Sequence, residues 1–136
     1  MLDKKLREKL WVLIEESKKN ANFKSAKQCE NLCKLLNENC KIRDTMDWLM
    51  MEFSEIMNEF ISDKEFKLLY KENMGFVNKD KDLDFISWVV LQGKELYDDY
   101  FTRGFIAIHL YISDNKIDVS DYEYASMMDA FHWIEK

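Results

Sequence analysis

Residues 42–61 read IRDTMDWLMMEFSEIMNEFI, and this stretch decides the fold class. Large apolar side chains recur in it at spacings of three and four residues, which is the period of one face of an α-helix. Trp48 and Met51 lie off that stripe, so we expect a helix that is apolar on more than one side and central in the fold. The stripe itself comprises Met46, Leu49, Met50, Phe53, Ile56, Met57, Phe60 and Ile61.

Helical patterns of the same kind cover most of the remaining chain. The 136 residues include no proline and only three glycines, whereas all-β folds need turn residues at short intervals. With 47% hydrophobic residues, the chain is long enough to bury one sizeable core. The sequence therefore predicts an all-α protein, a single compact bundle of about six to seven helices that forms one domain over residues 1–136. We expect helices at residues 2–18, 24–37, 42–61, 62–70, 83–101, 105–111 and 121–135.

Local signals refine these boundaries. Ser62 with Glu65, and Ser120 with Glu123, have the spacing of capping boxes, so a helix is expected to begin at each serine. Gly93 falls in the middle of the expected fifth helix, where glycine costs about 1 kcal/mol relative to alanine. We therefore expect another backbone to pack very close to Gly93.

Charge narrows the class of partner. The chain has 26 acidic and 20 basic residues, a net charge of −6 and a pI near 5.0. Nucleic-acid binding normally needs a concentrated basic face, so no nucleic-acid partner is expected. A basic protein would instead be attracted.

The sequence also indicates a compartment. No apolar run approaches the length needed to span a bilayer, and the charged start of the chain is unlike a secretory leader, so no membrane association is expected. The three cysteines, Cys29, Cys33 and Cys40, are odd in number and too closely spaced for a disulfide framework. We expect buried thiols in a reducing cytoplasm.

Signatures of catalysis and of metal or cofactor binding are missing from the sequence. The glycines are isolated, and no histidine lies near a cysteine in sequence. His109 and His132 are expected to be packed and hydrogen-bonded rather than metal ligands, since no third ligand accompanies them. No catalytic residue, metal site or cofactor is therefore predicted.

Carboxylates recur one helical turn apart at Glu55 with Glu59 and at Glu95 with Asp99. Such pairs can perform acid–base chemistry, but in a chain this acidic they are expected on a solvated face. Glu95 lies on an apolar-rich segment, so we expect it to be partly buried and to need a partner.

Residues 84–97, DFISWVVLQGKELY, resemble the signature of a bacterial family, domain of unknown function 4240. In that family a tryptophan precedes two aliphatic residues, then Gln-Gly-Arg-Glu and an aromatic residue. Here Lys94 stands where the family usually has arginine. Residues 11–17 and 122–131 resemble the family's opening and closing helices. The matching motif positions are Trp88, Gln92, Gly93, Lys94, Glu95 and Tyr97.

The resemblance brings no established activity, but several family members resemble immunity proteins encoded near toxins. Together with the acidity and the aromatic content, it leads us to expect an immunity-type protein that neutralises a basic toxin domain, perhaps a nuclease, by occlusion. Two acidic groups at the ends of the fifth helix are the candidate partner-binding residues. They are Asp80, Asp82 and Asp84 at one end, and Asp98 and Asp99 at the other.

Two alternatives remain open. A small-ligand or enzymatic domain would use Trp88, Gln92 and Glu95 in a pocket, although we favour a supporting role for these side chains. An acidic mimic of nucleic acid would need its carboxylates gathered in one stripe, and their scatter through the sequence does not favour this. The sequence indicates no particular oligomeric state.

Overall fold

The computed structural model describes residues 4–74, 79–118 and 127–135. This part of the chain is all-α and contains no strand, so the predicted fold class is confirmed. The elements in chain order are α1 (Lys4–Ser17), α2 (Ser25–Asn39), α3 (Arg43–Ile61), α4 (Lys64–Met74), α5 (Lys79–Val90), α6 (Lys94–Arg103), α7 (Ile106–Asp114) and the 3₁₀ helix η1 (Met127–Ala130). Among these helices, none is long and apolar enough to cross a bilayer.

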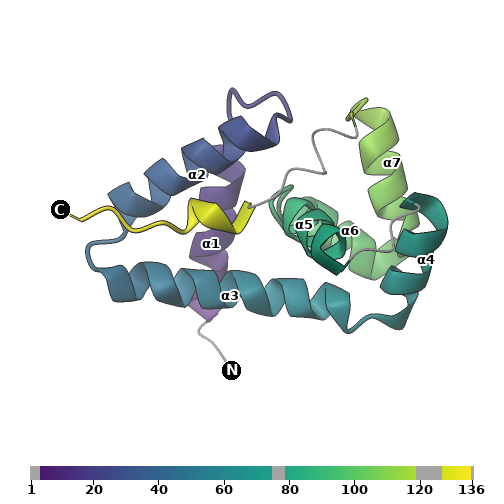
Figure 1. The fold of residues 1–136 in the computed structure, drawn as a ribbon, viewed down its shortest axis with the longest axis horizontal. Coiled ribbons are helices and arrows are strands. Elements are labelled where there is room, and N and C mark those ends of the chain that lie inside the picture. The colour runs from purple at the N-terminus through teal and green to yellow at the C-terminus, as the bar shows by residue number, and fades with distance from the viewer. Residues whose placement is uncertain (1–3, 75–78, 119–126, 136) are drawn as a thin grey trace.

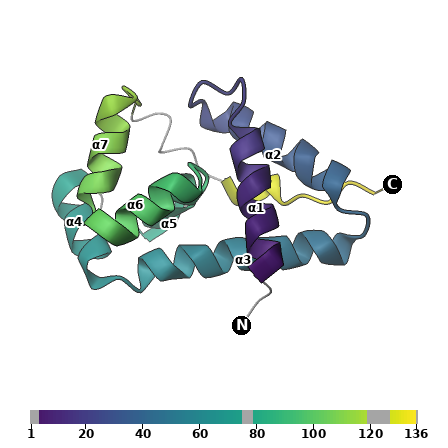
Figure 2. The ribbon, with the colours of Figure 1, turned by 180° about the vertical axis from the view of Figure 1, so that it is seen from behind.

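Helix α3 runs along one edge of the molecule in both views of the ribbon (Figures 1 and 2). Helices α1 and α2 pack against each other, and α1 also packs on α3. The other helices, α4 to α7, gather around the far end of α3 (Figure 1). The helix η1 and the residues after it lie between α2 and α3. A single cluster of buried residues extends through both groups of helices.

The predicted stripe of α3 supplies much of that core. Most of its side chains are buried, and only Met50 and Ile61 are half-buried. The expectation that α3 is central is wrong, however. Trp48 and Met51 are 48% and 50% exposed, because α3 lies at the edge and turns the side opposite its stripe to solvent.

The predicted continuous helix over residues 83–101 is also wrong. Helix α5 ends at Val90 and α6 begins at Lys94, with Gly93 between them at φ +110°. Glycine alone adopts this backbone conformation without strain, so Gly93 allows the chain to break and change direction. The close neighbour of Gly93 is a side chain rather than a backbone: a Cβ there would lie 2.6 Å from Oε2 of Glu15.

Two other boundaries differ from the predictions. Ser62 closes α3, and it is the Asp63 carboxylate that accepts the backbone N–H of Glu65, at 3.0 Å, at the start of α4. Residues 131–135 have no regular secondary structure, so the predicted helix over 121–135 is wrong there. The predicted cap at Ser120 and Glu123 lies outside the described residues.

Candidate functional site

The motif residues on the two sides of the break at Gly93 differ in burial. Trp88 and Gln92 are buried, at 1% and 3% exposure. Lys94 and Glu95, in the first turn of α6, are exposed, so the expectation that Glu95 is partly buried is wrong. Tyr97 is half-buried and points toward α1 and α3, where it packs on Trp11. These six positions therefore do not converge on one pocket.

Gln92 is engaged on all sides by contacts that support the fold. Its Nε2 donates to the carbonyl of Trp88 at 3.0 Å, and its Oε1 accepts the Tyr111 hydroxyl at 2.9 Å. Its carbonyl oxygen accepts Nζ of Lys18 at 2.8 Å. The side chain of Gln28 likewise donates to the carbonyl of Leu91. These donors satisfy carbonyls that the end of α5 leaves open, so the Gln92–Gly93 turn is a capped helix end.

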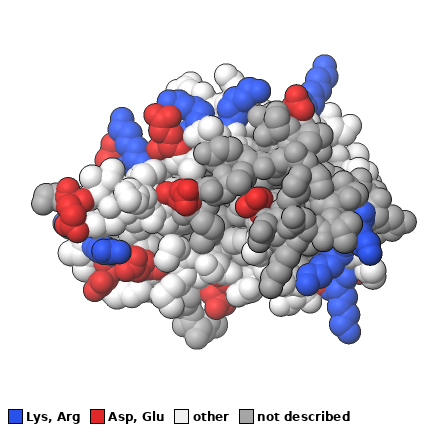
Figure 3. Space-filling view, viewed as in Figure 1, with Lys and Arg blue, Asp and Glu red and all other residues white. Residues whose placement is uncertain are grey.

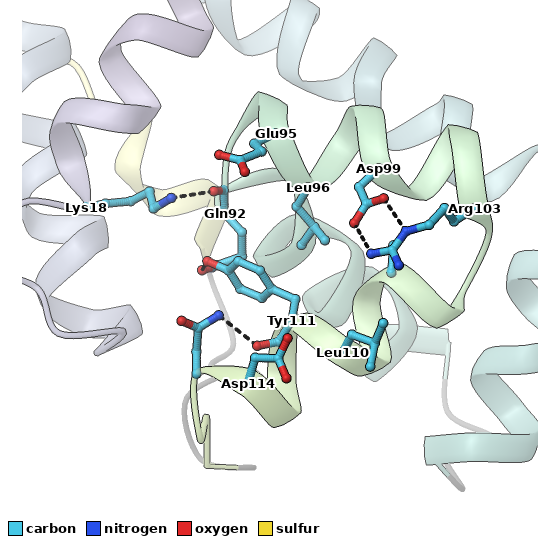
Figure 4. Close-up of a pocket in the computed structure, with 11 residues that line it drawn as sticks. Lys18, Gln92, Glu95, Leu96, Asp99, Arg103, Leu110, Tyr111 and Asp114 are labelled. Carbon is cyan, nitrogen blue, oxygen red and sulfur yellow. Dashed lines mark hydrogen bonds and ion pairs between the residues drawn. The ribbon is translucent and has the colours of Figure 1, made fainter.

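A cavity of about 320 Å³ lies beside this turn, between α6, α7 and the end of α1 (Figure 4). Tyr111 faces the cavity, and the pKa of its phenol is raised by burial and by the nearby charges of Glu15 and Glu95. Asp99 and Arg103 face each other across two contacts of 2.6 Å. The lining residues are Lys18, Gln92, Glu95, Leu96, Asp99, Arg103, Ala107, Leu110, Tyr111, Asp114 and Asn115.

Two of the five acidic residues expected to meet a partner, Asp98 and Asp99, are already engaged in ion pairs. Asp98 pairs with Lys94 at 2.8 Å, and Asp99 pairs with Arg103 within the same helix. The hydrogen bonds from Arg103 lower the pKa of Asp99. Asp84 is half-buried, and its carbonyl accepts the Ser87 hydroxyl at 2.9 Å.

The side chains of Asp80 and Asp82 lie outside the described part of the chain.

A charged cluster that was not predicted from the sequence joins α1, α3 and α6. Arg7 donates from Nε to Glu52 and from Nη1 to Glu59, the second at 2.7 Å. The Tyr97 hydroxyl also donates to Glu59. Burial and the hydrogen bond to Glu59 raise the pKa of Tyr97 to about 12. The Glu52 side chain is 3% exposed, and its Oε2 accepts no hydrogen bond within the described residues.

The opposite side of α3 is a solvent-facing row that we call the outer face of α3. It comprises Asp44, Asp47, Trp48, Met51, Glu55 and Asn58, all exposed. From Asp44 the row advances by four, three, four and three residues through Trp48, Met51, Glu55 and Asn58, and Asp47 lies beside it, so these side chains share one face of the helix. No ion pair found in the described ranges involves its carboxylates.

The space-filling view shows where the charges gather. On the face that Figure 3 shows, acidic side chains lie at the left and lower left together with a Lys or Arg side chain, and others lie among the Lys and Arg side chains of the upper edge, while Lys and Arg gather at the lower right. A signal for the outer face was present in the sequence, because Trp48 and Met51 lie off the apolar stripe and have acidic neighbours at helical spacing. Because we expected α3 to lie at the centre of the fold, the outer face was not predicted to be exposed.

The cysteines and histidines differ in how far the fold buries them. Cys29 and Cys40 are buried thiols, as predicted, and Cys33 is half-buried. His109 and His132 are both exposed, so the expectation that they are packed in the core is wrong. No group of three His, Cys, Asp or Glu side chains in the described ranges is arranged to hold a metal ion.

Comparison with models of protein families, with curated proteins and with solved structures found no match to this chain. The resemblance of residues 84–97 to domain of unknown function 4240 therefore stays a prediction.

Proposed function

We propose that this chain is an immunity-type binding protein that neutralises a basic toxin domain by occlusion, without catalysis, in the cytoplasm. The observation that carries the proposal is the outer face of α3, where carboxylates with no ion-pair partner among the described residues flank an exposed tryptophan and methionine. The row from Asp44 to Asn58 is about 21 Å long at the helical rise per residue. A surface of this kind offers both long-range attraction and short-range apolar contact.

The carboxylates provide the attraction. Asp44, Asp47 and Glu55 carry charge that no described cation neutralises, whereas Asp98 and Asp99 are paired within α6. Unpaired surface charge acts on an approaching partner of opposite sign and mainly raises the association rate. The overall charge of −6 acts in the same direction.

Trp48 and Met51 provide the anchor. Tryptophan is among the residues that most often dominate binding energy, and methionine adapts its shape to irregular surfaces. Both side chains are about half exposed, at 48% and 50%, and lie next to each other on the helix. A partner that covers them also covers the carboxylates on either side.

The test uses the product of a toxin-like reading frame next to the gene, if one is encoded there. Its binding to the purified chain is measured at two salt concentrations. We expect Trp48→Ala to weaken binding at least tenfold, and Asp47→Asn with Glu55→Gln to slow association and reduce its salt dependence.

Two variants serve as matched controls. Leu68→Ala removes an apolar side chain that is 69% exposed on α4, and Asp98→Asn removes a carboxylate that is already paired. Neither should change affinity appreciably. Absence of any binding would exclude the proposed function, whereas binding that ignores the α3 variants would exclude only this surface.

The ligand-pocket alternative has one observation in its favour, the cavity lined by Gln92 and Glu95. Trp88 is buried away from solvent and the polar atoms of Gln92 are engaged, so Glu95 is the motif side chain best able to hold a ligand. A ligand function predicts that Glu95→Gln abolishes small-molecule binding at unchanged stability. Gln92→Ala should instead destabilise the fold, because it removes the support at the end of α5.

The row of carboxylates on α3 also bears on the nucleic-acid-mimic alternative. A mimic presents charges at regular intervals with little apolar surface between them. Trp48 and Met51 interrupt this row, so apolar contact is part of the surface. That arrangement favours a partner protein whose binding surface is basic and partly apolar over mimicry of nucleic acid.

A further inference from the structure

Residues 131–135 cross the gap between α2 and α3 as a segment without regular secondary structure (Figure 1). The segment follows η1, whose last residue, Ala130, is fully buried. Phe131 and Trp133 are half-buried against the core, while His132 and Ile134 between and after them are exposed. This alternation with a period of two is typical of an extended peptide lying on a surface.

Asn37 of α2 forms two hydrogen bonds to the backbone of this segment, one on each side of Trp133, and we call this pair of hydrogen bonds the clamp. Its Nδ2 donates to the carbonyl of His132 at 2.9 Å, and its Oδ1 accepts the N–H of Ile134 at 2.8 Å. A carboxamide has one donor group and one acceptor group, so it can pair with a peptide backbone much as a neighbouring strand does. The clamp involves only backbone atoms of the segment, so it does not depend on the side chain at position 132.

The aromatic side chains supply the specificity that the clamp lacks. The ring of Phe131 lies 5.2 Å from that of Phe53 on α3, and Trp133 packs against the same core. Backbone hydrogen bonds combined with pockets for alternate side chains are the recurring way in which proteins recognise extended peptides.

The surface of α2 extends beyond the segment. A groove of about 700 Å³ runs along the helix and is lined on one side by Ala26, Cys29, Cys33 and Asn37. Asp129 and Ile134 line its other side, and Ile134 is 54% exposed. The chain's own segment thus borders the groove without filling it.

We propose that the surface between α2 and α3 around Asn37 and Phe53, beside this groove, binds an extended peptide with two aromatic side chains two residues apart, and that residues 131–135 are its resident occupant. A partner segment of the same chemistry binds by displacing the resident residues. This inference is independent of the proposed toxin-binding function, because it uses a different surface.

The test measures how a fluorescent peptide with the sequence of residues 129–136 binds the full chain. In the wild-type chain the resident segment competes, so binding is weak. In the full-length variant Phe131→Ala with Trp133→Ala the competitor is weakened, and we expect the peptide to bind at least tenfold more tightly. Adding Asn37→Ala to that variant should lower the affinity about tenfold, since both clamp hydrogen bonds are lost.

His132→Ala, at the exposed position, is the matched control and should leave peptide binding as in the wild type. Equal affinity of the wild-type chain and the double variant, or affinity that is unchanged by Asn37→Ala, would overturn the proposal. Should the double variant fail to fold, hydrogen exchange on the wild-type chain decides instead. Excess unlabelled peptide must then accelerate exchange of the Ile134 amide, and a rate independent of peptide would refute displacement.

Discussion

Both sides of α3 carry carboxylates, but those on one side are ion-paired within the fold and those on the other side face solvent. Glu52 and Glu59 face α1 and α6, where Arg7 forms an ion pair with each of them. Asp44, Asp47 and Glu55 face solvent and have no ion-pair partner in the described part of the chain. A carboxylate on the first side stabilises this fold, whereas one on the second side leaves its charge available to another molecule. The position of one cation, Arg7, accounts for the difference.

The largest expected effect comes from removing that cation. Arg7→Met leaves the Glu52 carboxylate buried without a counter-charge, and breaking a pair of this kind typically costs about 3–5 kcal/mol. We expect the free energy of unfolding, measured by urea denaturation with circular dichroism, to fall by about 3 kcal/mol. Arg103→Met is the control, because the exposed pair of Arg103 with Asp99 should contribute far less. Equal effects of the two variants would contradict the comparison.

Tyr97→Phe should have a smaller effect. It removes the hydroxyl that donates to Glu59 while the ring stays packed on Trp11 and Phe60. A loss of about 1 kcal/mol in unfolding free energy is expected from one hydrogen bond of this type. In a double-mutant cycle with Glu59→Ala, which removes the acceptor of this hydrogen bond, the two losses should not add, because the contact between Tyr97 and Glu59 is part of both. Strict additivity would show that the hydroxyl does not stabilise the cluster.

The same tyrosine predicts a pH dependence. The pKa of Tyr97 is about 12 in the folded chain, above the unfolded value of about 10. The unfolded state therefore loses the phenolic proton first, and the contribution of the hydroxyl to stability is complete below pH 10 and declines as pH rises toward 12. Chemical denaturation between pH 9 and 12 should show the wild type losing its advantage over Tyr97→Phe. A constant advantage would mean that the pKa is not raised.

The smallest effect on stability is expected on the outer face of α3. Asp47→Asn combined with Glu55→Gln removes two charges without a described partner, so the unfolding free energy should change by no more than about 0.5 kcal/mol. Urea denaturation tests this directly. Destabilisation comparable to that of Arg7→Met would show that these carboxylates support the fold and are not reserved for a partner.

The sequence predicted the helices better than it predicted how they meet. Spacings of three and four residues identified the stripe of α3, because that period is local. The pairing of Arg7 with Glu52 joins residues 45 positions apart, and nothing in the chain near either residue indicates it. The same holds for the outer face of α3, since exposure depends on which helices cover it.

Two further features could not be predicted from the sequence, namely the break at Gly93 and the conformation of residues 131–135. The apolar residues keep the same helical spacing before and after Gly93. This spacing therefore does not distinguish one continuous helix from two helices separated by a break. At the other position, Phe131 and Trp133 are two residues apart, which is the spacing of an extended segment. The predicted helix over residues 121–135 instead places Phe131 and Ile134 on one helix face, because they are three residues apart, and this spacing conceals the extended conformation.

The contact of Asn37 with Ile134 spans 97 residues of sequence. During synthesis, helix α2 is complete long before the residues that lie against it have left the ribosome. Its surface around Asn37 therefore stays uncovered until residues 131–135 have been synthesised, and the packing of α2 against this segment forms only then. Chaperones that bind extended apolar segments would have access to the nascent chain throughout this interval.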